Sequence, residues 1–79
     1  MSPTILRERG YQFLLYTNDH LPPHIHVRKS GHEAVVKLDS ADILVSHGYN
    51  ERELKKICKI VRDNQIMMLT EWDKIHPTE

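Results

Sequence analysis

Cysteine, glycine and charge of one sign are all scarce in this chain of 79 residues, which has one Cys and three Gly. The single cysteine excludes an internal disulfide framework and fits a reducing cytosol. Eleven basic residues balance eleven acidic ones, which disfavours a strong non-specific nucleic-acid binder but leaves RNA contact through a local basic patch open. The sequence has no glycine-rich phosphate loop and no serine in a nucleophile elbow, and these absences disfavour an NTPase and a triad hydrolase.

Long apolar runs are missing as well. No stretch approaches the roughly 20 apolar residues of a membrane span, and no apolar segment of a signal peptide follows the first residues. We therefore expect a cytoplasmic protein without membrane association. Its length predicts a single compact domain over residues 1–79 with one modest core. Because so small a core is marginal by itself, the length is compatible with a partner protein or a homodimer.

What the chain does contain is a series of short strand patterns followed by a helix pattern. Ser30-Gly31 is typical of a two-residue hairpin turn between two of the strands. The sequence predicts an α+β fold with a three- to four-stranded antiparallel sheet over about residues 3–45, packed on one face by a long C-terminal helix over about residues 51–75. The strand segments are 11–17, 24–29 and 32–38, with 3–7 as a short first strand and 43–45 as either a short strand or a buried connection.

The start of the predicted helix is well defined. Asn50 is a favourable N-cap, and Glu53 follows three residues later. Apolar residues then recur at spacings of three and four along residues 54–72 and form one stripe, apart from a polar step at Gln65. Asp63-Asn64 is a candidate break between two helices, but we favour one long helix.

The most informative segment is Pro22-Pro23-His24-Ile25-His26-Val27. The two prolines stop any helix and favour extended backbone. In a strand, successive side chains point to opposite faces, so His24 and His26 share one face and Ile25 and Val27 the other. Imidazole changes its charge near neutral pH and is the commonest metal ligand. The segment therefore predicts proton transfer, metal binding or anion recognition.

Acid–base chemistry is the first interpretation of this segment. His24 and His26 are the candidate general base and general acid for cleavage of RNA by its 2′-hydroxyl, with no metal and no cofactor. Arg28 alternates onto the same face and is the candidate catalytic cation. Three further residues are candidates for substrate binding: His20 on the approach loop, His47 before the helix and Tyr16 as a stacking platform.

Two other interpretations stay open. A metal site needs three or four ligands, with His20 as a third and Asp19, His32 or Glu33 as a fourth, but the cluster lacks cysteines. We therefore assign no metal ligand. Alternatively, the histidines are polar outward-facing residues or an interface for a partner protein.

Several segments together resemble a small bacterial family, domain-of-unknown-function family 4160. They are the opening Pro-Thr-Ile, Gly-Tyr-x-Phe at 10–13, His20-x-Pro-Pro-His-Ile-His-Val, His47-Gly48-Tyr49 before Glu53-Leu54, and Trp72. The resemblance implies a compact α+β domain and the toxin role in a type II toxin–antitoxin pair. The implied partner is a small antitoxin of domain-of-unknown-function family 2442, and His20, His24 and His26 carry the family signature. At the level of fold order alone, the chain is also similar to small RNA-cleaving toxins with a histidine on a hairpin strand.

Overall fold

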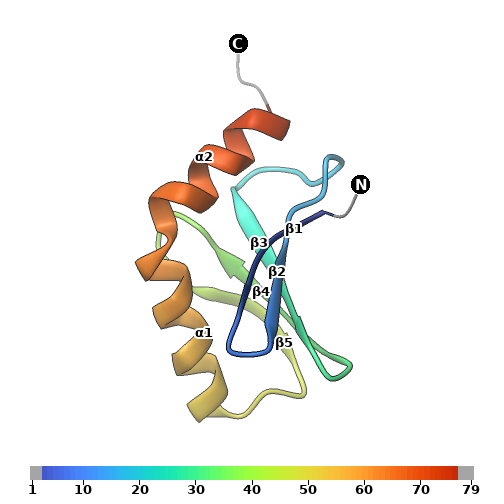
Figure 1. Cartoon of the computed structure of the whole chain (residues 1–79), viewed down its shortest axis with the longest axis vertical. Coiled ribbons are helices and arrows are strands. Elements are labelled where there is room, and N and C mark those ends of the chain that lie inside the picture. Colours follow the sequence, from blue (N-terminus) through green and yellow to red (C-terminus); the bar gives the residue numbers. More distant parts are fainter. Residues whose placement is uncertain (1–2, 77–79) are drawn as a thin grey trace.

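The computed structural model describes residues 3–76 and has an α+β fold, as predicted (Figure 1). Five strands precede two helices. All neighbouring strands are antiparallel, and their order in the sheet follows the chain. The elements are β1 (Thr4–Glu8), β2 (Tyr11–Leu14), β3 (His24–Lys29), β4 (His32–Lys37), β5 (Ile43–His47), α1 (Glu51–Asp63) and α2 (Gln65–Ile75).

The predicted three to four strands were too few, because both marginal segments form edge strands. β1 pairs with β2 and β5 pairs with β4, each across one register shift. The second strand is shorter than the predicted 11–17: its last residue, Leu14, pairs with His26, and residues 15–23 form a loop. The predicted hairpin at Ser30-Gly31 is confirmed, and both of its residues have positive φ (51° and 81°), as the tight turn requires.

The two faces of the sheet differ sharply. On one face, Phe13, Val27 and Ala34 lie in a row across the three central strands and are fully buried. They pack with helix residues such as Ile57 and Trp72 into one core cluster. The opposite face, which we call the outer face, carries polar side chains in the central strands, and by register it includes Gln12, His24, His26, Arg28, Glu33 and His47.

The predicted single long helix is wrong, because the helix breaks at Asn64. The Asn64 side chain donates to Ile60 O (2.8 Å), so it competes with the backbone bonds that would continue the helix. Gln65 Nε2 donates to Leu38 O (2.7 Å) and Asp39 O (2.9 Å), which ties the start of α2 to the β4–β5 turn. The predicted N-cap is confirmed: Asn50 Oδ1 accepts a hydrogen bond from Glu53 N (2.9 Å).

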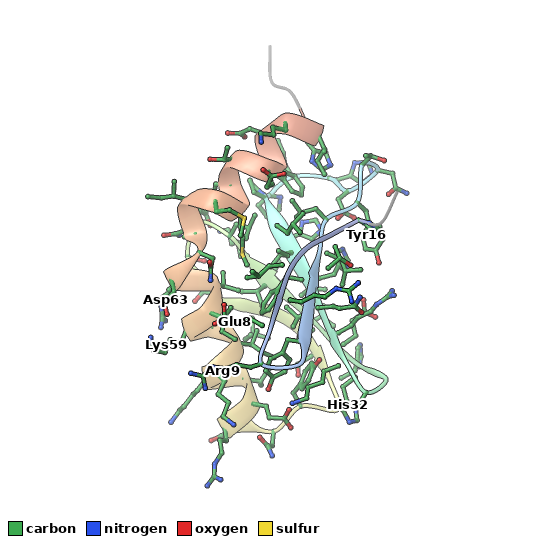
Figure 2. All side chains as sticks on the ribbon, in the orientation of Figure 1. Glu8, Arg9, Tyr16, His32, Lys59 and Asp63 are labelled. Carbon is green, nitrogen blue, oxygen red and sulfur yellow. The ribbon has the colours of Figure 1, made fainter. Side chains whose placement is uncertain are left out.

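This break determines where α2 lies. In Figure 1, α1 runs beside the sheet and α2 continues to the end of the sheet at which β3 begins. Tyr16 lies near this end and His32 near the opposite end (Figure 2). Neither helix within residues 3–76 has the length and apolar character that a membrane span requires.

Candidate functional site

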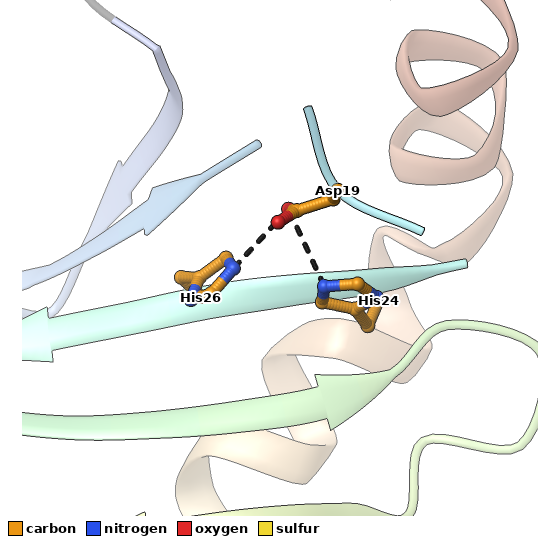
Figure 3. Close-up of side chains that lie close together, drawn as sticks. All are labelled: Asp19, His24 and His26. Carbon is orange, nitrogen blue, oxygen red and sulfur yellow. Dashed lines mark hydrogen bonds and ion pairs between the residues drawn. The ribbon is translucent and has the colours of Figure 1, made fainter. Parts of the chain in front are cut away.

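The first residues of β3 bring two imidazole rings together on the outer face. The ring centroids of His24 and His26 lie 5.3 Å apart. Asp19, on the loop before β3, points its carboxylate at both rings: Oδ2 lies 3.3 Å from His24 Nε2 and 3.2 Å from His26 Nε2 (Figure 3). We call these three residues the Asp19 cluster. Its imidazoles are only 15% and 18% exposed, so they are more enclosed than the sequence suggested.

The other ring nitrogens also face oxygen acceptors. His24 Nδ1–H donates to the backbone oxygen of Pro22 (2.8 Å). His26 Nδ1 lies 3.5 Å from Glu33 Oε2. This nitrogen is buried and makes no hydrogen bond within the described chain. Each imidazole is therefore placed between two oxygen acceptors.

Aromatic side chains enclose the Asp19 cluster from two sides. Tyr16 meets His26 edge-on, with ring centroids 4.8 Å apart. Trp72 of α2 lies 5.4 Å from the His24 ring and stacks on His76 at 3.8 Å. The helix break thus supplies one wall of the cluster, because it allows α2 to reach the start of β3.

Charged side chains continue the outer face beside the cluster. Arg28 follows His26 by two residues on β3 and is half exposed, with Nε 3.7 Å from Glu33 Oε2. Glu33 pairs with Arg28 on one side and with His47 on the other. His47 is therefore two strands from Arg28, roughly 10 Å away at the usual strand spacing.

Most of the predicted site residues meet on this face. The structure places His24, His26 and Arg28 on one face of β3 and adds Tyr16 against His26. His47 is exposed on the same face but apart from the cluster, and His20 is exposed on the loop and does not belong to the cluster.

Two residues of the site were not among the predicted site residues. In the sequence-based metal interpretation, Asp19 and Glu33 are candidates only for a fourth ligand. Asp19 reaches the histidines because the loop folds back over the start of β3, and Glu33 does so because it lies one strand across. The one available signal for Asp19 was its position shortly before the two prolines.

The marked pKa shifts of tyrosines lie at the opposite end of the core. Burial raises the pKa of Tyr49 to about 12. Burial also raises the pKa of Tyr11, and its hydrogen bond to Glu53 Oε2 (3.1 Å) adds to the effect. These phenols stay protonated near neutral pH.

Comparison with known proteins gives a match to a protein family. A family model described as "Domain of unknown function (DUF4160)" matches residues 10–73, a span that includes every residue of the Asp19 cluster, Arg28 and Trp72. No curated protein and no solved structure matches the chain.

Proposed function

The chain belongs to the DUF4160 family, and we propose that it is the toxin of a bacterial type II toxin–antitoxin module that cleaves RNA with His24 and His26. The family resemblance supplies the biological setting of this proposal. The chemistry rests on the cluster at the start of β3.

The observation that carries the proposal is the convergence of two imidazole nitrogens on one anionic oxygen. Asp19 Oδ2 lies within 3.3 Å of both Nε2 atoms. A non-bridging phosphate oxygen is also anionic and accepts a hydrogen bond from His26 Nε2–H in the same way as the carboxylate. Because Asp19 belongs to a loop and not to the sheet, a phosphodiester can displace its carboxylate and take its place between the rings.

The hydrogen bonds support a division of the two roles. The bond from His24 Nδ1–H to Pro22 O leaves the Nε2 lone pair of the neutral ring free to take the proton of a 2′-hydroxyl. The 2′-oxygen then attacks phosphorus and the bond to the 5′-oxygen breaks. His26, protonated at Nε2, gives its proton to the leaving 5′-oxygen. The products are a 2′,3′-cyclic phosphate and a 5′-hydroxyl.

Arg28 supplies positive charge beside the reacting phosphate. It follows His26 on the same face of β3, and its side chain is 51% exposed. Its contact with Glu33, at 3.7 Å, is loose enough for the guanidinium to turn toward a phosphate. We assign it the stabilisation of the developing negative charge.

The direct test uses purified, tag-free protein and a defined RNA, with and without a chelator. We expect cleavage that needs no metal ion and therefore persists with the chelator, with 2′,3′-cyclic phosphate ends. The double variant His24→Ala, His26→Ala should lose activity by at least about 100-fold, the usual contribution of general acid–base catalysis. His32→Gln is a matched control, because His32 lies at the far end of the sheet against Tyr49 (Figure 2). Cleavage by the double variant at the wild-type rate would remove both histidines from the chemistry.

Exposed apolar residues favour a second candidate function, a non-enzymatic docking module. Leu44 and Val45 of β5 are 48% and 44% exposed. Val45 lies in the same cross-sheet row as His26, with Val35 between them. In this alternative, a small antitoxin of the 2442 type covers the outer face. Histidine substitutions should then weaken antitoxin binding in calorimetry, and the wild-type protein should show no RNA turnover.

A further inference from the structure

The imidazoles of the Asp19 cluster have more acceptors around them than a neutral ring can satisfy. A neutral imidazole has one N–H donor and one lone pair. His24 lies between Pro22 O and Asp19 Oδ2, and His26 lies between Asp19 Oδ2 and Glu33 Oε2. In either tautomer, each neutral ring turns a lone pair toward an oxygen acceptor. A single metal ion between the rings and the carboxylate would take up the lone pairs that face Asp19.

We propose that Asp19, His24 and His26 bind one divalent transition-metal ion of the zinc class, through Asp19 Oδ2 and the two Nε2 atoms. With both rings protonated at Nδ1, His24 donates to Pro22 O and His26 points its N–H at Glu33. Metal-bound histidines almost always donate their other ring N–H to a backbone carbonyl or a carboxylate. Both kinds of acceptor are already in position, and the buried His26 Nδ1 gains a defined role as donor.

The distances fit such an ion. Zinc binds histidine nitrogen and carboxylate oxygen at about 2.0–2.2 Å, which places neighbouring ligand atoms about 3.0–3.4 Å apart in octahedral or tetrahedral geometry. The oxygen of Asp19 lies 3.3 and 3.2 Å from the two nitrogens. One nitrogen of each ring and one oxygen of Asp19 all lie within 4.8 Å of one another, so the edge between the two rings shortens by up to about 1.4 Å when the ion binds. Two imidazoles and one carboxylate favour zinc, iron, nickel or copper over calcium and magnesium, which prefer oxygen ligands.

The ion and the proposed chemistry exclude each other. A metal bound to His24 Nε2 occupies the lone pair that would take the proton of the 2′-hydroxyl, and it holds Asp19 in the place of the phosphate. Zinc should therefore inhibit RNA cleavage; this consequence rests on the proposed function, whereas the metal site itself does not.

Zinc binding is measured by calorimetry on tag-free protein that has been stripped with a chelator. We expect about one equivalent of Zn²⁺. The fluorescence of Trp72, the one tryptophan of the chain, reports the same event because its ring lies 5.4 Å from His24. Asp19→Asn should lower the zinc affinity by more than about 100-fold, since loss of an outer partner alone lowers metal affinity 10- to 100-fold. His47→Ala is the control, because it removes an exposed imidazole outside the cluster.

A second variant separates loss of the site from loss of the fold. Glu33→Gln changes a side chain that is 40% exposed, and it should weaken zinc binding about 10- to 100-fold while leaving the urea midpoint unchanged. Binding of less than about a tenth of an equivalent by wild-type protein, or equal affinity in Asp19→Asn, would overturn the metal site. Zinc binding without RNA cleavage supports the site and refutes the proposed function. Chelator-insensitive cleavage without zinc binding does the reverse.

Discussion

Gln65 joins the helix break to the sheet, and its replacement tests whether the break is held by tertiary contacts. Its Nε2 donates to Leu38 O at 2.7 Å and to Asp39 O at 2.9 Å. Gln65→Met keeps the length of the side chain but removes both donors. A typical hydrogen bond contributes about 1 kcal/mol net, so the two together predict a loss of about 2 kcal/mol in the free energy of unfolding.

This loss is large for a domain of this size. Urea unfolding followed by Trp72 fluorescence measures it directly, and the thermal midpoint should fall by roughly 8–16 °C. Gln12→Met is the matched control: the Gln12 amide makes one long contact, 3.4 Å to Thr4 Oγ1. The control should stay within about 0.5 kcal/mol of wild type. If Gln65→Met also stays within about 0.5 kcal/mol, the contacts of Gln65 with the β4–β5 turn do not hold α2 in place.

Three further predictions concern the core around α1 and β5. The unfolding free energy should fall as the pH rises from 10 toward 12, because folded Tyr49 keeps its proton up to a pKa of about 12 whereas the unfolded phenol releases it near 10. Urea midpoints of wild type and Tyr49→Phe, measured across this pH range, give the slope of stability against pH. Equal slopes in the two proteins would contradict the assignment to Tyr49. Gly48→Ala should lower the unfolding free energy by more than about 1 kcal/mol, because Gly48 has φ +93° and an added Cβ would overlap the His32 ring. In a His32→Ala background, chemical denaturation should show a smaller loss of unfolding free energy, because the overlap is gone and only the backbone strain remains. Burial raises the pKa of the Cys58 thiol, so a disulfide reagent at neutral pH should modify the folded protein more slowly than the urea-unfolded protein, and equal rates would count against this burial.

Local sequence patterns predicted much of the fold, because they depend on neighbouring residues alone. The alternation after the two prolines predicted that His24 and His26 share a face, and the two rings do lie side by side. The hairpin turn at Ser30-Gly31 and the N-cap at Asn50 follow from backbone conformation and one short-range hydrogen bond. The predicted number of strands was too low, because each edge strand depends on pairing with a single neighbour.

The helix break shows where local patterns stop being sufficient. The apolar stripe spans residues 54–72 with a single polar step at Gln65, so periodicity favoured one helix. Besides the local bond of Asn64 to Ile60 O, the break is held by Gln65, whose partners lie 26 and 27 residues earlier in the chain. No periodicity within the helix carries that information.

The same division applies to the candidate site. The sequence by itself determined the pair of imidazoles, because side-chain direction in a strand alternates from residue to residue. Only the tertiary structure decided what surrounds the pair: the loop brings Asp19 over both rings, strand register brings Glu33 beside His26, and the bend between the helices brings Trp72 against His24. Each of these contacts depends on how separate elements pack in space, and for that reason the shared face was readable from the sequence whereas the composition of the cluster was not.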